Sequence, residues 1–188
     1  MRNIAIFASG NGSNFEAIAT ATQAGEIGAK VSLLVCDKPD AHVIFRAKNH
    51  QIPVFAFSPA QYADKAAYEA EILDQLRALD IQFIALAGYM RLIGKTLLEA
   101  YPHRIVNIHP SLLPAFPGKG AIQQAYESGA TETGVSVHYV DAGMDTGPVI
   151  AQRKVEIAET DTLQTLEEKL HKIEHNLYIE TLKSLFEA

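Results

Sequence analysis

The sequence predicts a single α/β domain of three layers, in which helices flank a mostly parallel, mixed sheet of about seven strands. Short apolar segments alternate with amphipathic segments along the first two thirds of the chain. This alternation is typical of strands that pair in parallel across intervening helices. The last two apolar segments, 135–141 and 149–157, have no helix between them, so we expect them to pair antiparallel and make the sheet mixed.

Each expected strand is short and apolar. The segment 83–87 lacks any polar alternation, which indicates a strand buried on both faces. Pro110 ends the segment 104–109 because proline has no backbone donor. The expected strands are 4–8, 31–36, 54–57, 83–87, 104–109, 135–141 and 149–157.

The expected helices separate these strands. Gly25 and Gly129 stand where the first and the fourth helix should end. The last helix, from about residue 161, carries its leucines and isoleucines at steps of three and four, which predicts one buried face. The other expected helices are 14–25, a short one that ends near 50, 60–80 and 121–128.

Composition excludes several classes of protein. The 188 residues have a net charge of −6 and no block of Lys or Arg, so we expect no nucleic-acid or membrane partner. A single cysteine, Cys36, excludes an internal disulfide and a cysteine-rich zinc site and suits a reducing compartment. The apolar run 4–8 is too short for a signal peptide, and the run 83–90 covers less than half a membrane span. We therefore expect a cytoplasmic chain of one domain.

A glycine-rich turn, Ser-Gly-Asn-Gly-Ser-Asn at 9–14, follows the first expected strand. Glycines allow close approach of a ligand, and the N–H groups that begin the next helix favour a phosphate. The turn is no dinucleotide fingerprint, because Phe15 stands where the third glycine would be. A phosphate site is the better interpretation; a tight turn without a ligand is the alternative.

Two polar residues end the expected strand 104–109. Alternate residues of a strand share a face, so Asn107 and His109 should point the same way, opposite Val106 and Ile108. An amide donor beside an imidazole suits acyl transfer, because both can stabilise a developing oxyanion and the imidazole can move a proton. The alternative is a buried pair whose hydrogen bonds are satisfied by nearby carbonyls.

The loop between the last two strands, 141–148, supplies a carboxylate. Asp145 could orient His109 and favour its charged form. An aspartate in a glycine-rich loop can equally be a turn-former. On the preceding strand, His138 is expected only to satisfy local hydrogen bonds.

The last helix contains His-Lys-Ile-Glu-His at 171–175, which matches the inverted zinc-protease motif. Few residues downstream could supply a third zinc ligand. The solvent-exposed side of an amphipathic helix explains the two histidines equally well. Glu174 lies beside the buried stripe and could reach a ligand. In the segment 87–93, Arg91 among large apolar residues suits the wall of a slot for a flat, partly anionic molecule.

Taken together and in this order, these segments resemble the phosphoribosylglycinamide formyltransferases of purine synthesis, a folate-dependent formyltransferase family. The motifs that carry the resemblance are Ser-Gly-x-Gly-Ser-Asn at 9–14, Asn-x-His-Pro-Ser-Leu-Leu-Pro at 107–114 and Asp-x-Gly-Pro at 145–148. The matching pieces run from the N-terminus to about Tyr178 and include 87–93, 116–118, 124–125, 135–140 and Gln152.

The resemblance implies that a formyl group passes from 10-formyltetrahydrofolate, a co-substrate, to the amine of glycinamide ribonucleotide, without a metal. It implies that Asn107 and His109 stabilise the tetrahedral oxyanion, while Asp145 holds His109 and a water that helps to move protons. The implied substrate residues are Gly12, Ser13 and Asn14 for the phosphate and Glu174 for the ribose. The implied folate residues are Lys65, Met90, Arg91, Leu92, Ile93, Asn107, Val140, Asp141 and Met144.

The resemblance also predicts how the work is divided along the single domain, residues 1–188. Residues 1–100 should bind the phosphate, and residues 101–188 should hold the folate and the catalytic groups, in a monomer or homodimer. Lys119-Gly120 stands where some members carry a histidine, so no imidazole from that loop can assist. The alternatives are another formyl-transfer enzyme of the same scaffold (hydrolase, sugar-amine or initiator-tRNA) and a module that only binds a phosphorylated metabolite.

Overall fold

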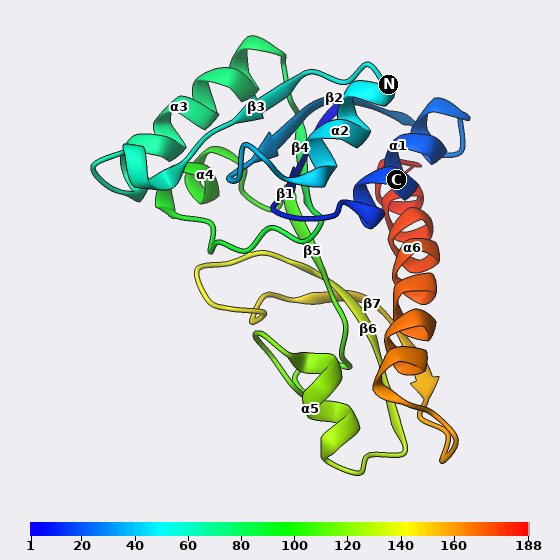
Figure 1. Cartoon of the computed structure of the whole chain (residues 1–188). Coiled ribbons are helices and arrows are strands. Elements are labelled where there is room, and N and C mark those ends of the chain that lie inside the picture. The colour runs from blue at the N-terminus through cyan, green and yellow to red at the C-terminus, as the bar shows by residue number, and fades with distance from the viewer. Residues whose placement is uncertain (188) are drawn as a thin grey trace.

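The computed structural model describes residues 1–187, which form one seven-stranded sheet with helices on both faces (Figure 1). The strand order is β3-β2-β1-β4-β5-β6-β7. The first five strands pair in parallel, and the last two are antiparallel, which confirms the predicted mixed sheet. The strands are β1 (Arg2–Ala8), β2 (Ala29–Cys36), β3 (Val54–Ala56), β4 (Phe83–Leu86), β5 (Ile105–His109), β6 (Glu132–Tyr139) and β7 (Val149–Glu156).

Two apolar layers lie on opposite faces of this sheet. Ile4 and Ile6 of β1 pack with α1 (Ser13–Gln23), α2 (His42–Asn49) and α6 (Leu163–Glu187). The alternate residues Ala5 and Phe7 pack with α3 (Lys65–Ala78) and α4 (Lys95–Ala100). This alternation is what two buried faces require of a central strand. The remaining helix, α5 (Ala121–Glu127), lies against α6.

Two differences from the sequence-based expectation have local causes. The helix expected over 60–80 begins only at Lys65, because Asp64 caps it by accepting a hydrogen bond from the Ala67 amide at 2.8 Å. A 3₁₀ turn, Pro59–Gln61, occupies the start of that segment. Helix α4 was not expected at all: it has six residues and only Leu97 is fully covered, too little for a periodic pattern.

The strand order places the functional edge. Strand β1 lies between β2 and β4, so the loops after β1 and β4 diverge from the same carboxyl edge, where open α/β sheets bind ligands. Leu86, the last residue of β4, pairs with Asn107, so β5 continues beyond β4 to His109. Val106 and Ile108 belong to the α1–α6 layer. Asn107 and His109 therefore face the other way together, as predicted.

No helix within residues 1–187 combines the length and the apolar character needed to cross a membrane.

Candidate active site

A cavity of about 650 Å³ opens at this carboxyl edge. Its lining comes from the loops that follow β1, β4 and β5, from the segment 118–121 and from the β6–β7 loop. Helix α6 adds His171 and Glu174. The cavity therefore joins segments from both ends of the chain, and it contains all three groups that the sequence singled out separately: the glycine-rich turn, the Asn107–His109 pair and Asp145.

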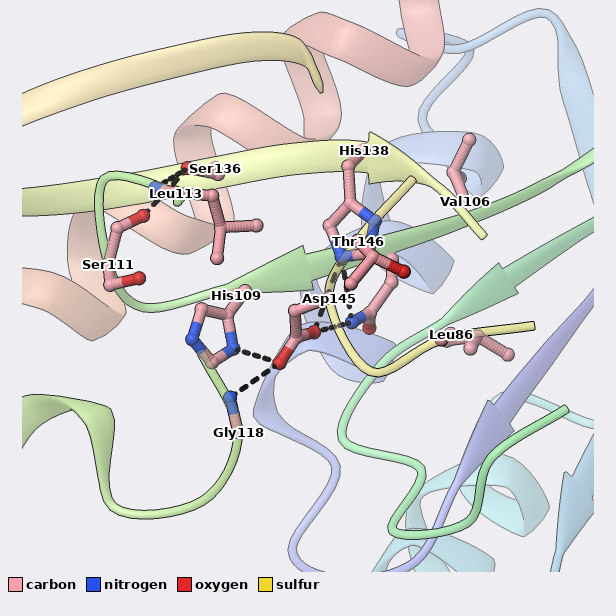
Figure 2. A network of polar contacts seen from close by, with 12 residues as sticks. Leu86, Val106, His109, Ser111, Leu113, Gly118, Ser136, His138, Asp145 and Thr146 are labelled. Atoms are coloured by element: carbon pink, nitrogen blue, oxygen red, sulfur yellow. Dashed lines mark hydrogen bonds and ion pairs between the residues drawn. The ribbon is translucent and has the colours of Figure 1, made fainter. Parts of the chain in front are cut away.

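Asp145 lies at the centre of the polar groups in this cavity (Figure 2). One carboxylate oxygen, Oδ2, accepts a hydrogen bond from the Gly118 amide at 2.8 Å and lies 3.4 Å from Nδ1 of His109. The other, Oδ1, accepts from Nδ2 of Asn107 at 3.4 Å and lies 3.4 Å from Nε2 of His138. Asp145 also has a left-handed backbone, with φ of 56°. A non-glycine residue in this region is a feature that clusters at functional sites.

Both ring nitrogens of His109 face oxygen acceptors. Nε2 lies 2.8 Å from the carbonyl oxygen of Phe116, while Nδ1 faces the Asp145 carboxylate. A neutral imidazole has only one N–H, so one of these nitrogens would present a lone pair to an oxygen. Both contacts become hydrogen bonds only when both nitrogens carry a proton.

The pKa of Asp145 is held below its usual range. Burial by itself would raise this pKa, because the side chain is only 10% exposed. The hydrogen bond with His138, the Gly118 amide and the charges of His109 and His138 together outweigh burial and favour the carboxylate. Asp145 is thus a stable negative charge beside His109 at neutral pH.

His138 belongs to this group, although the sequence predicted only local hydrogen bonds for it. Its Nδ1 lies 2.8 Å from the carbonyl oxygen of Tyr139, which assigns a proton to that nitrogen. Its Nε2 lies 3.3 Å from Nδ2 of Asn107 and 3.4 Å from Oδ1 of Asp145. Asn107 and His138 stand directly opposite on β5 and β6, a relation that appears only once the strand register is known.

The loop after β5 is fixed from behind, so that its backbone can contact His109 and Asp145. Ser136 Oγ accepts from the Leu113 amide at 3.0 Å and donates to the Ser111 carbonyl at 2.7 Å (Figure 2). Nε2 of Gln152 donates to Ser136 Oγ and to the Leu113 carbonyl, each at 2.9 Å. These bonds hold the part of the loop that leads to Phe116, and Gln152 gains a structural role that its motif position did not reveal.

The glycine-rich turn also lines the cavity, with residues 10–14. Gly12 has φ of +83°, and a Cβ there would lie 2.4 Å from Cγ2 of Val43, so only glycine fits. Ser13 and Asn14 follow at the start of α1, and the buried Oδ1 of Asn14 has no hydrogen-bond partner. Glu174, which is 5% exposed, accepts a hydrogen bond from Nδ1 of His171 at 2.9 Å.

Apolar side chains dominate the third side of the cavity. Met90, Leu92 and Met144 are large and exposed, and they line the cavity with Arg91, Ile93 and Val140. The structure does not bring Lys65 or Asp141 to this wall. Instead, Lys65 Nζ donates to the Leu92 carbonyl at 2.7 Å, and Asp141 accepts from the Gly143 amide and from Thr146. Both residues act on the backbone of the loops that do line the cavity.

The two histidines of the zinc-protease motif face different partners. Nδ1 of His171 lies 2.9 Å from Oε2 of Glu174, whereas Nε2 of His175 lies 3.2 Å from Ser13 Oγ. Within residues 1–187, no group of three or more His, Cys, Asp or Glu side chains is arranged so that it could hold a metal ion. Contact with Glu174 raises the pKa of His171, while burial lowers that of His175.

Comparison with known proteins gives consistent matches. The family model described as "Formyl transferase" matches residues 2–182. A phosphoribosylglycinamide formyltransferase of Bacillus subtilis is 57% identical over 185 residues, which cover 98% of this chain and 95% of the relative. The structure is similar to glycinamide ribonucleotide transformylase 1 from Geobacillus kaustophilus, with a TM-score of 0.96, 59% identity and 99% of each chain covered. A phosphoribosylglycinamide formyltransferase from Brucella melitensis has a TM-score of 0.94 at 38% identity, covering 100% and 96%.

Proposed function

This chain belongs to the formyl transferase family, and from that membership we infer the reaction that it catalyses and the residues that carry it. It transfers the formyl group of 10-formyltetrahydrofolate to the primary amine of glycinamide ribonucleotide, a step of de novo purine biosynthesis. The products are formylglycinamide ribonucleotide and tetrahydrofolate, so the folate is a co-substrate. The observation that carries the residue assignment is that Asp145 contacts both Asn107 and His109 on the wall of one cavity.

In the proposed mechanism, Asn107 and His109 stabilise the oxyanion. The amine attacks the formyl carbon, a C–N bond forms, and the carbonyl π electrons move onto the formyl oxygen. Nδ2 of Asn107 turns one N–H from Oδ1 of Asp145 to that oxygen, and Nε2 of the protonated His109 ring exchanges the Phe116 carbonyl for it. When the bond from the carbon to N10 breaks, N10 takes a proton and the former amine loses one.

Asp145 supports this chemistry without bonding to the carbon. Its carboxylate orients His109 through the 3.4 Å contact with Nδ1 and stabilises the ring when the ring carries a second proton. We assign to it also the water that carries the proton between the two nitrogens. Because the pKa of Asp145 is lowered, the carboxylate stays ionised while the reaction proceeds at neutral pH.

Each substrate has its own side of the cavity in this proposal. The phosphate of glycinamide ribonucleotide binds to Gly12, Ser13 and Asn14, where the backbone N–H groups at the start of α1 favour an anion. Glu174 binds the ribose hydroxyls. The pteridine and benzoyl parts of the folate lie along the apolar wall made by Met90, Arg91, Leu92, Ile93, Val140 and Met144.

We further propose that residues 1–188 act as one domain on small molecules, in the cytoplasm, without a metal, nucleic-acid or membrane partner. The net charge of −6 supports this choice of partners. The chain is expected to be a monomer or a homodimer, which sedimentation at several protein concentrations would decide. The proposed division between residues 1–100 and 101–188 is not strict, because we assign 90–93 to the folate and Glu174 to the ribonucleotide.

The proposed reaction is tested by following 10-formyltetrahydrofolate consumption by absorbance, with glycinamide ribonucleotide present and then absent. We expect turnover only when the amine is present, with formylglycinamide ribonucleotide identified by its mass. Equal deformylation without the amine would identify a hydrolase and contradict the proposal. Tight ribonucleotide binding without any turnover would support a binding module instead.

A further inference from the structure

We propose that Asp37 is a positioning residue for the folate side of the cavity: it fixes Met90 and Arg91 in place without touching either substrate. The proposal rests on the proposed function of these two residues as part of the folate wall. Asp37 directly follows β2 and is not among the residues that line the cavity. It lies behind the wall, and its side chain is only 1% exposed.

Both oxygens of this buried carboxylate are used. Oδ1 accepts a hydrogen bond from Ser9 Oγ at 2.6 Å, and Oδ2 accepts from Nε of Arg91 at 2.9 Å. A buried carboxylate is costly unless charged or polar donors satisfy it, so these two donors are held firmly. Arg91 is 40% exposed, which leaves the far end of its guanidinium open to the cavity while Nε stays on Asp37.

Ser9 extends the effect of Asp37 to the backbone of the wall. Its hydroxyl proton goes to Asp37, so its oxygen is free to accept from the Met90 amide, at 2.9 Å. The Ser9 amide in turn donates to the Gly88 carbonyl at 3.0 Å. One carboxylate thus fixes two consecutive residues of the wall, Met90 through Ser9 and Arg91 directly. An asparagine at 37 could accept from Ser9 or from Arg91 but would turn an N–H towards the other.

The phosphate side of the cavity is held by different groups. The Val43 amide donates to the Gly10 carbonyl at 3.0 Å. Arg46 donates from Nε to the Asn11 carbonyl at 2.8 Å and from a terminal nitrogen to Asn11 Oδ1 at 2.6 Å. These contacts come from α2, whereas Asp37 reaches the turn only at Ser9, ahead of the phosphate residues Gly12, Ser13 and Asn14. Losing the Asp37 carboxylate should therefore loosen the folate wall and leave the phosphate turn in place.

The test is a steady-state comparison of wild type with Asp37→Asn, varying each substrate separately. We expect the KM for 10-formyltetrahydrofolate to rise about tenfold, with kcat and the KM for glycinamide ribonucleotide within about twofold of wild type. Asp40→Asn removes the same charge from the same loop at an exposed position and should leave all three constants unchanged. A general defect, in which both KM values rise alike, would overturn the proposal. An unchanged KM for the folate would overturn it too.

Two further variants keep the proposal testable if Asp37→Asn folds poorly. Ser9→Ala retains the ion pair between Asp37 and Arg91 but loses the bond to the Met90 amide, so it should also raise the folate KM selectively. If Asp37 acts through Ser9 and Arg91, adding Asp37→Asn to the double variant Ser9→Ala/Arg91→Met should raise the folate KM no further. Additive defects would contradict the proposed route.

Failure of the proposed function would look different. A wild-type chain without amine-dependent transfer would remove the reaction but not the positioning claim, which calorimetric binding of tetrahydrofolate then tests. The dissociation constant should still rise about tenfold in Asp37→Asn and stay unchanged in Asp40→Asn. Equal binding by wild type and Asp37→Asn would overturn the positioning role.

Discussion

Replacing Asp145 with asparagine should lower kcat by roughly 10²–10³-fold while the protein remains folded. The carboxylate serves donors on both sides: the Gly118 amide and His109 on Oδ2, and Asn107 on Oδ1. An amide can offer an oxygen to only one side and presents N–H groups to the other. Each hydrogen bond to a charged group contributes about 1.5–3 kcal/mol. Losing one fully and weakening a second raises the barrier by about 3–4 kcal/mol, which gives the stated factor.

The assay is turnover at saturating concentrations of both substrates, with the dissociation constant of glycinamide ribonucleotide measured in parallel. We expect that constant to change less than threefold, because none of the polar partners of Asp145 is Gly12, Ser13 or Asn14. Glu159→Gln removes one charge from an exposed position and is the matched control. Turnover of Asp145→Asn within about threefold of wild type would contradict the role assigned to this carboxylate.

Three other predictions test separate parts of the account. Gly12→Ala should lower the free energy of unfolding, measured by urea denaturation, by about 1–3 kcal/mol, because the new Cβ would meet Val43. The control Gly25→Ala has a similar φ but open space around it, so its free energy of unfolding should fall less. Glu174→Gln should raise the KM for glycinamide ribonucleotide about tenfold and leave the folate KM within about twofold, and the reverse pattern would contradict the ribose assignment. The lowered pKa of Asp145 means that its contribution to stability is present above about pH 4 and is lost on protonation below that. Acid titration of unfolding should therefore show a smaller loss in Asp145→Asn than in wild type.

The fold was largely predictable because its signals are local. Apolar runs separated by amphipathic segments identified every strand, and the missing helix between 135–141 and 149–157 predicted the antiparallel hairpin, now β6 and β7. What could not be predicted depends on context: α4 is too short for a periodic pattern, and the start of α3 was set by the Asp64 cap. The strand order, which creates the functional edge, is a property of the whole sheet.

The site was predictable in its side chains but not in its backbone. Asn107 and His109 stood out as polar residues at the end of a buried strand, and Asp145 as a carboxylate in a glycine-rich loop. His109 and Asp145 also contact the Phe116 carbonyl and the Gly118 amide. These are backbone groups, so the residue types in the sequence do not indicate their role. His138 was undervalued, since its contact with Asn107 follows from the β5–β6 register alone.

Lys65 has a contact that the resemblance did not predict. It is expected near the anionic part of the folate, and its ammonium group donates to the Leu92 carbonyl. The same segment of wall is thus held by Lys65 from α3 and by Asp37 from the end of β2. A residue that orders a ligand-binding loop and one that touches the ligand occupy neighbouring positions, and only the contacts distinguish them.

The most direct test of the account is the single-turnover rate of formyl transfer by His109→Ala at saturating concentrations of both substrates. If His109 stabilises the oxyanion, the rate should fall by at least about 10²-fold while glycinamide ribonucleotide still binds as in wild type. A rate near that of wild type, with both substrates bound, would contradict the assignment of Asn107, His109 and Asp145 as the reacting centre.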